Sequence, residues 1–327
     1  MVKRISVEYK ALTHSVNGKK QRKMKKAWEV RSIPAWNYLE YLVLRGFAGA
    51  VNLMSIGLST RIARGVGNVL YWVLPGRRKV AFSNLEITYK DSLSPKEKEV
   101  IVRETFRNLC TSLMEFFRIP SMLAEAQDRF QFEGTEYIDE AFKNNKGIIL
   151  AISHIGSWEY LAFLPYLRGY PCSVVVRPSK NPYIDKWIES LREKTKLKPI
   201  DKLSAAKKIL KRLKQNELVA ILTDQWAGHD GVWADFFGSP TSTTSIPARL
   251  AHRTNSIIIP AYCLRTSVGK YKIVICPPVE VPETEDYETT VTAKLNELLE
   301  AEIRKYPSQW SWAHKRWKRE GRFLRNQ

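Results

Sequence analysis

The chain has 327 residues, of which 44% are hydrophobic, so it is long enough for one large domain with a substantial core. Its 53 Lys and Arg against 33 Asp and Glu give a net charge of +20, which points to an anionic partner. The four cysteines show no paired spacing, so neither a disulfide framework nor a zinc site is expected.

The excess positive charge is concentrated at the two ends of the chain. Residues 1–34 carry +8 and residues 304–327 carry +7, which leaves about +5 for the rest. Nucleic acid, an anionic bilayer and an acidic protein all fit such a distribution. Residues 1–34 lack the apolar stretch of a signal peptide and are typical of a basic flexible arm.

Residues 35–90 are expected to form amphipathic, membrane-associating helices. Residues 38–58 are long enough to span a bilayer, but they contain Glu40, Arg45 and Asn52. An Arg near the centre of a span costs about 2.5–3.5 kcal/mol. A helix lying in the membrane interface is therefore favoured, while a true span and a helical hairpin packed on the domain remain open.

Residues 91–327 predict an α/β domain with a mainly parallel, twisted sheet flanked by helices. Ser94 and Pro95 are typical of a helix start, and this helix extends towards residue 122. Further along, apolar runs that predict strands alternate with helical patterns, which favours parallel pairing. The strands are expected at 147–153, 172–176, 217–223, 257–262 and 271–276, and the helices near 158–167, 182–195, 203–215 and 287–305.

Three of these predicted strands end on residues that can carry chemistry. The first ends at His154, the second at Arg177, and the third at Asp224 and Gln225. The carboxyl ends of parallel strands lie at one edge of a sheet, where open α/β sheets bind ligands. A base, a cation and a carboxylate are therefore expected to converge there.

His154 and Glu159 are five residues apart, and their relation depends on the turn between them. If the strand stops at His154 and Gly156 turns the chain, Ser157 caps a helix and Glu159 falls in its first turn, within reach of the imidazole. A carboxylate beside His fixes the tautomer and raises its basicity. The spacing equally allows a structural His at a turn, with Glu159 serving the helix N-terminus.

The aromatic and basic stretch "YPSQWSWAHKRWKREGRF" begins at residue 306. On a helix, Trp310, Ala313 and Trp317 share one face by spacings of three and four. This predicts an apolar side that docks and a cationic side that meets phosphates or an acidic carrier protein. A solvated basic face is the alternative.

Three motifs follow one another along the chain: "SHIGSWE", "DQ…GVWADFFGSPTSTTSIPARLAHRTNSIIIPAY" and "YPSQWSWAHKRWK". In this order they resemble the bacterial lipid A late acyltransferases, within the glycerolipid and lysophospholipid acyltransferase superfamily. The resemblance implies transfer of a fatty acyl group from acyl carrier protein, or from acyl-CoA, to a hydroxyl of a lipid A precursor. It places the enzyme at the cytoplasmic face of the inner membrane, monotopic or single-pass. A lysophospholipid, glycolipid or aminolipid acceptor is the alternative.

The resemblance also implies roles for individual residues. His154 is the expected general base and Glu159 its partner, without a metal or other cofactor. The expected substrate contacts come from Arg177, Asp224, Gln225, Ser157, Trp158, Asn181 and Arg249. Ser157 stands where the family usually has Asn, and a covalent acyl-serine route is a further alternative. The anionic partner is expected to be a membrane surface and not nucleic acid, because no nucleic-acid-binding motif appears.

Overall fold

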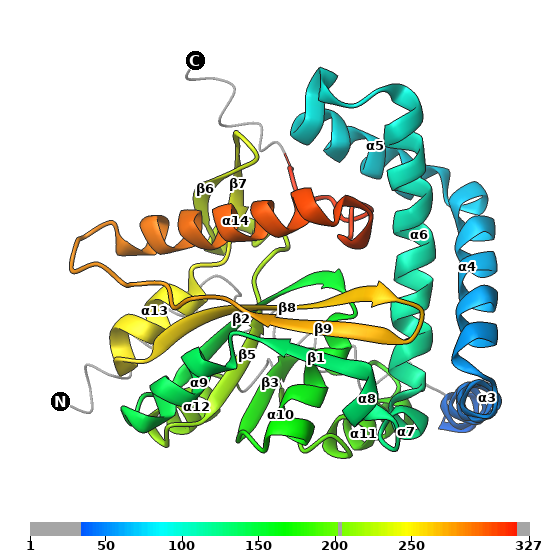
Figure 1. Cartoon of the computed structure of the whole chain (residues 1–327), viewed down its shortest axis with the longest axis horizontal. Coiled ribbons are helices and arrows are strands. Elements are labelled where there is room, and N and C mark those ends of the chain that lie inside the picture. Colours follow the sequence, from blue (N-terminus) through cyan, green and yellow to red (C-terminus); the bar gives the residue numbers. More distant parts are fainter. Residues whose placement is uncertain (1–33, 202–204, 319–327) are drawn as a thin grey trace.

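The computed structural model describes residues 34–201 and 205–318. A seven-stranded sheet with the order β1-β9-β8-β2-β5-β3-β4 forms the centre of the molecule, with helices on both faces (Figure 1). Neighbouring strands are parallel except for the antiparallel pair β8–β9. The strands are β1 (Phe130–Glu133), β2 (Ile148–Gly156), β3 (Cys172–Val176), β4 (Lys198–Asp201), β5 (Leu218–Leu222), β8 (Ile257–Ser267) and β9 (Lys270–Ile275).

The expected α/β class with a mainly parallel sheet is confirmed, and each predicted strand is present. The sequence patterns missed the short edge strands β1 and β4. They also missed a separate antiparallel hairpin, β6 (Val232–Phe236) with β7 (Ser239–Thr243). The missed strands mix polar and apolar residues, so they lack the continuous apolar run by which β3 and β5, of similar length, were predicted.

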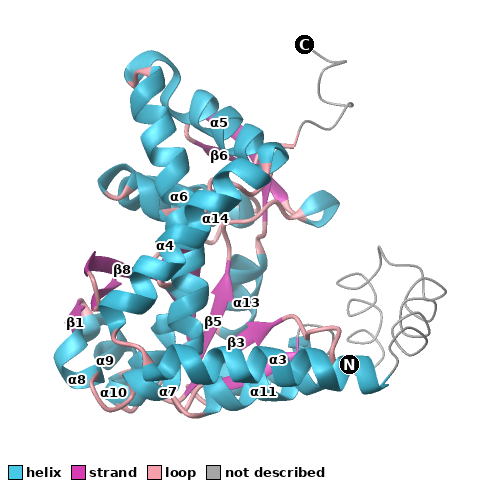
Figure 2. Ribbon diagram, turned by 90° about the vertical axis from the view of Figure 1, so that its right-hand side faces the viewer, coloured by secondary structure: helices cyan, strands magenta, loops and turns pink. Residues whose placement is uncertain are grey.

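The N-terminal part of the described chain is helical. Its helices are α3 (Pro34–Leu53), α4 (Ile56–Val73), α5 (Pro75–Tyr89) and α6 (Pro95–Phe117), and α4 lies alongside α6 (Figures 1 and 2). The predicted segment 38–58 is broken because the side chain of Ser55 caps α4 by accepting from the Leu58 N–H. Ser94 starts α6 as predicted, and it also forms a capping box with Glu97. Within the described residues, no helix has the length and apolar character that a membrane crossing requires.

Helices cover both faces of the sheet, so β2 is buried on both sides. Ile148, Leu150 and Ile152 pack towards α6, α10 and α11, while Ile149 and Ala151 pack towards α12, α13 and α14. The remaining helical elements are η1 (Lys90–Ser92), α7 (Ile119–Met122), α8 (Ala126–Arg129), α9 (Thr135–Lys143), η2 (Trp158–Ala162), α10 (Phe163–Arg168), α11 (Pro182–Glu193), α12 (Ala205–Lys214), η4 (Gly228–Asp230), α13 (Ile246–Thr254), α14 (Tyr287–Lys305) and η5 (Pro307–Gln309).

The prediction of a helical docking face near the C-terminus is wrong. After η5 the chain from Trp310 to Lys318 is not helical. Trp310 and Trp312 are buried in a core cluster, and Arg316 is completely buried. The predicted basic arm falls almost entirely outside the described residues, and the domain boundary at residues 90 and 91 stays a prediction.

Candidate active site

The pairing of β2 with β5 brings His154 and Asp224 together. Ile152 lies opposite Leu222, the last residue of β5, in the parallel register, and two residues further along each segment the chain reaches His154 and Asp224. The Thr223 N–H donates to the Ile152 carbonyl and extends the pairing. The predicted convergence at the carboxyl edge of the sheet therefore holds for these two residues.

Asp224 is 3% exposed and accepts three hydrogen bonds. Its Oδ1 lies 2.8 Å from His154 Nδ1, and its Oδ2 accepts from the His154 backbone N–H and from Trp310 Nε1, each at 2.9 Å. Burial alone raises the pKa of Asp224, but the His154 charge and these hydrogen bonds lower it to about 2. The carboxylate is therefore ionised, and His154 Nδ1 carries the proton that bonds to it.

This hydrogen bond leaves the other ring nitrogen of His154 as the basic atom. Burial lowers the pKa of His154, but the Asp224 carboxylate, by charge and by hydrogen bond, and the charge of Glu159 raise it above the usual 6.5. His154 Nε2 lies 3.4 Å from Nε2 of Gln225, an exposed side chain. The Trp158 ring lies beside the imidazole, with 5.3 Å between ring centroids.

Glu159 is not the carboxylate that hydrogen-bonds the imidazole, so this part of the sequence-based expectation is corrected. It forms an ion pair with Arg192, with 2.9 Å between Glu159 Oε1 and Arg192 Nη2. The turn differs from the expected one, because β2 continues to Gly156 and Ser157 leads into a 3₁₀ helix without capping it. Glu159 thus acts on His154 only through its charge.

The turn after His154 is held by a buried polar network. Gly156 has a φ of +60°, and a Cβ there would lie 2.1 Å from the Cys263 carbonyl oxygen, so this position requires glycine. The Ser157 hydroxyl donates to Glu115 at 2.6 Å, and Glu115 pairs with Arg265 at 2.7 Å. Ser157 is 2% exposed, so its side chain belongs to the buried network that supports the turn.

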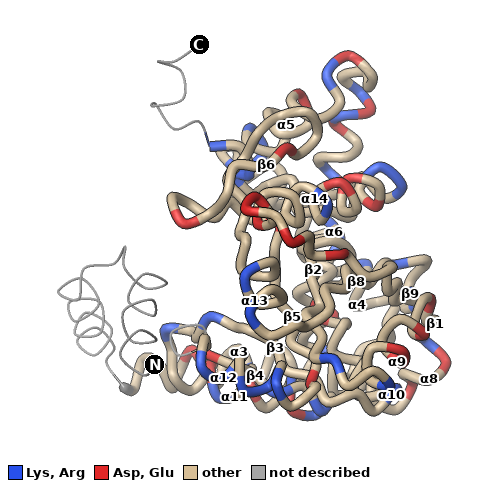
Figure 3. Tube along the Cα trace, turned by 90° about the vertical axis from the view of Figure 1, so that its left-hand side faces the viewer, with Lys and Arg blue, Asp and Glu red and all other residues tan. Residues whose placement is uncertain are grey.

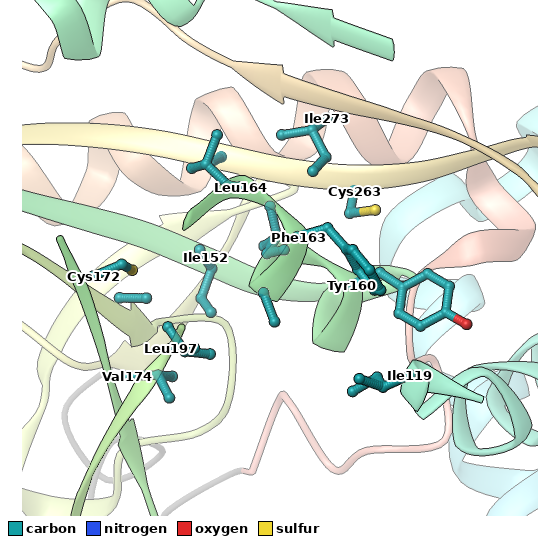
Figure 4. Close-up of a cluster of buried hydrophobic side chains, with 14 of the residues drawn as sticks. Ile119, Ile152, Tyr160, Phe163, Leu164, Cys172, Val174, Leu197, Cys263 and Ile273 are labelled. Carbon is teal, nitrogen blue, oxygen red and sulfur yellow. The ribbon is translucent and has the colours of Figure 1, made fainter. Parts of the chain in front are cut away.

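An apolar slot of about 160 Å³ lies beside this cluster, between the sheet and the helices on the α10–α11 side. Ile152, Cys172, Val174 and Leu197 contribute to its walls, and Figure 4 shows them gathered on one side of the core. The charged residues of its lining are Glu159, Arg177 and Arg192. Glu159 and Arg177 follow the carboxyl ends of β2 and β3, so they mark the end of the slot nearest His154.

Two predicted substrate contacts lie elsewhere. Asn181 caps α11 and donates to the Asn37 carbonyl at 2.7 Å, which ties α3 to the body of the protein. Arg249 forms an ion pair with Glu288 at 2.8 Å and thereby joins α13 to α14. The described contacts do not bring either residue to His154.

Trp310 is a site residue that sequence reasoning missed. It forms a bridge with Ile155, the adjacent Ser311 N–H donates to the His154 carbonyl, and its own indole N–H holds Asp224. Trp310 as a whole is 2% exposed. Pro307, which opens η5, was not a signal against the predicted face, because a proline is tolerated in the first turn of a helix.

Comparison with known proteins gives this geometry its context. The family model described as bacterial lipid A biosynthesis acyltransferase matches residues 23–319. The chain belongs to this family. It is therefore an acyltransferase, as the three motifs predicted, and the His154–Asp224 cluster lies within the matched region.

Individual relatives are distant but cover most of the chain. A lipid A biosynthesis acyltransferase of Haemophilus influenzae is 28% identical over 79% of this chain and 84% of its own length. The lipid A biosynthesis lauroyltransferase of Escherichia coli is 27% identical over the same shares. A phosphatidylinositol mannoside acyltransferase of Mycobacterium tuberculosis is 26% identical over 62% of this chain and 66% of its own length. The relatives of this chain thus include enzymes named for different acceptors.

Proposed function

We propose that this acyltransferase moves a fatty acyl group from a thioester donor to a hydroxyl of a lipid A precursor, with His154 as the general base. The observation that carries the proposal is the pair formed by His154 Nδ1 and the ionised Asp224, which makes Nε2 the basic atom of the neutral imidazole at the carboxyl edge of the sheet. A base positioned in this way contributes about 10²–10⁴-fold to the rate.

In the proposed step, His154 Nε2 takes the proton of the acceptor hydroxyl as its oxygen attacks the thioester carbonyl carbon. A C–O bond forms, the C–S bond breaks, and the imidazolium returns the proton to the leaving thiolate. Asp224 is a positioning residue that stabilises the imidazolium. The exposed Gln225 amide, next to Nε2, can donate to the carbonyl oxygen as charge develops on it. Ser157, buried and bonded to Glu115, does not suit the acyl-serine route.

The apolar slot is the proposed seat of the acyl chain. It begins beside the catalytic cluster and is lined mainly by apolar side chains, which suits a hydrocarbon chain. Each methylene buried there contributes about 0.8 kcal/mol, so the depth of the slot can select chain length. Arg177 and Arg192 lie where the thioester end of the donor would enter.

An acyl carrier protein is the proposed donor, with acyl-CoA as the alternative. Figure 3 shows Lys and Arg positions at α12, and α12 contains no acidic residue. Its basic residues are Lys207, Lys208, Lys211, Arg212 and Lys214. A single cationic helix surface suits a protein partner that presents an acidic helix.

The proposed place of action is the cytoplasmic face of the inner membrane, bound through α3 and α4. These helices expose large apolar side chains, among them Val43 at 66%, Leu53 at 91% and Trp72 at 63%. Exposed apolar surface on this scale is typical of a membrane or protein interface. Arg78 and Arg103 stack near Trp72, with 5.4 and 5.9 Å from guanidinium carbon to ring centre, as interfacial aromatic and cationic groups do.

A glycolipid acceptor is the second candidate, because one relative is named a phosphatidylinositol mannoside acyltransferase. The deciding experiment supplies acyl carrier protein with a labelled acyl chain to a purified lipid A precursor, a mannosylated phosphatidylinositol and a lysophospholipid. Labelling of the lipid A precursor alone supports the first proposal. The variant His154→Ala should lose more than nine-tenths of the transfer while remaining folded, and a folded variant that retains a larger share would end the base assignment.

A further inference from the structure

A second cavity, of about 430 Å³, lies at the start of α4 and shares no lining residue with the apolar slot or the His154 cluster. Met54, Ser55, Ile56 and Gly57 line it on one side and Arg118 on another. The pair Glu125–Arg129 also contributes to the lining, and its two charges balance each other at 2.6 Å. The net charge of the lining therefore comes from Arg118.

Arg118 is a buried cation without a carboxylate partner among the described residues. The residue is 5% exposed, and its Nη1 donates to the carbonyls of Val51 and Met54 at 2.6 and 2.7 Å. Its Nε is buried and has no hydrogen-bond partner. A buried charge is costly unless it is paired, so a guanidinium that faces a cavity in this state favours an anion as its partner.

The first turn of α4 offers donors to the same cavity. Ser55 accepts from the Leu58 N–H with its side chain and from the Ser59 N–H with its carbonyl. The N–H groups of Ile56 and Gly57 have no partner within the described part of the chain. A helix of this length places partial positive charge at its N-terminus, and free N–H groups there bind phosphate oxygens.

The surroundings of the cavity favour an amphiphile over a small ion. Leu53 next to it is 91% exposed, Leu58 is 47% exposed, and Val268 in its lining is 59% exposed. Apolar side chains around an anion site match a molecule with a charged headgroup and hydrocarbon chains. The volume also exceeds what a single phosphate ion requires.

We propose that this cavity binds the phosphate of an anionic lipid headgroup, with Arg118 and the N–H groups of Ile56 and Gly57 as its donors. The site would anchor the protein to a phospholipid while the catalytic cluster acts on another molecule. It does not depend on the proposed reaction, since binding is measured without an acyl donor.

Gly57 gives a test that leaves the fold intact. A Cβ at Gly57 would meet no atom within 4 Å, so a side chain fits without displacing its neighbours. The variant Gly57→Asp places a carboxylate in the first turn of α4, where it favours the helix but repels an anion. Gly57→Asn is the matched control, with nearly the same shape and no charge. Changing Arg118 is less suitable because its Nη1 also holds two backbone carbonyls.

The experiment measures binding of the full chain to dioctanoyl phosphatidate, to dioctanoylglycerol and to inorganic phosphate by titration calorimetry. We expect wild type and Gly57→Asn to bind the phosphatidate alike, and Gly57→Asp to bind it at least about tenfold more weakly. Its melting temperature should not fall below that of Gly57→Asn.

Three outcomes decide the proposal. Equal binding of the phosphatidate by Gly57→Asp and Gly57→Asn would overturn the site. Inorganic phosphate that binds as tightly as the phosphatidate would overturn the lipid assignment and leave a site for free phosphate. Binding of dioctanoylglycerol that depends on residue 57 would overturn the role of the phosphate.

Discussion

The substitution Asp224→Asn tests which group orients the base. Asp224 accepts three hydrogen bonds, one of them from His154 Nδ1. An Asn carbonyl at the Oδ2 position can still accept from the His154 backbone and from Trp310. Its amide NH₂ then faces Nδ1 and donates to it, so the imidazole carries its proton on Nε2 and cannot act as a base.

The loss expected from this change is the whole contribution of the base, about 10²–10⁴-fold in kcat, or about 2.7–5.5 kcal/mol. KM should change little, because Asp224 is buried and its three hydrogen bonds go to His154 and Trp310. Glu159→Gln is the matched control, and we expect it to cost less than Asp224→Asn because Glu159 contacts Arg192 and not the imidazole. Trp310→Phe, which removes one donor to Asp224, should have an intermediate effect.

The measurement is steady-state acyl transfer for each variant beside a thermal unfolding curve. An Asp224→Asn enzyme that is folded and keeps more than a tenth of wild-type kcat would refute the assignment of Asp224. A Glu159→Gln variant with the larger loss would instead restore Glu159 as the partner of His154.

Three further predictions concern pH, chain length and the donor. Activity should fall as pH drops through a midpoint above 6.5, because neighbouring carboxylates raise the pKa of His154 and the base must be neutral. A pH–rate profile checks this prediction, and a midpoint below 6.5 would contradict it. Ala220→Val narrows the apolar slot and should disfavour long acyl chains by about fourfold per displaced methylene. Ala151→Val, on the opposite face of the sheet, should leave the preference for chain length unchanged. Competition between donors of different chain length measures the preference of each variant. Replacing Lys207 and Lys211 of α12 with Glu should raise KM for acyl carrier protein but not for acyl-CoA, and an equal rise for both would exclude a carrier-protein surface there.

Much of the fold could be predicted because its signals are local. The long apolar runs of β2, β5 and β8 and the capping sequence at Ser94 each identify an element without reference to the rest of the chain. The edge at which His154 and Asp224 meet followed from the parallel arrangement alone. A sequence pattern is sufficient for such features because the period and the cap lie within a few residues of each other.

The partner of His154 could not be predicted in this way. It depends on which strand lies next to β2, and that order is set by packing across the whole sheet. Glu159 was the expected partner because it follows His154 closely and because the resemblance implied it, whereas Asp224 is seventy residues away and lies just beyond the end of β5. Trp310 was misassigned for the same reason, since its helical spacing was local and its contact with Asp224 is not.

The segment that follows α14 has a consequence for how the enzyme becomes active. The sheet and its apolar slot are built from residues that precede Cys276, yet the indole that fixes Asp224 lies at position 310. A chain that extends only to the end of the sheet therefore lacks Trp310, one of the hydrogen-bond donors to Asp224. The segment after α14 therefore completes two things at once, the hydrogen bonding of Asp224 and the core cluster that contains Trp310 and Trp312.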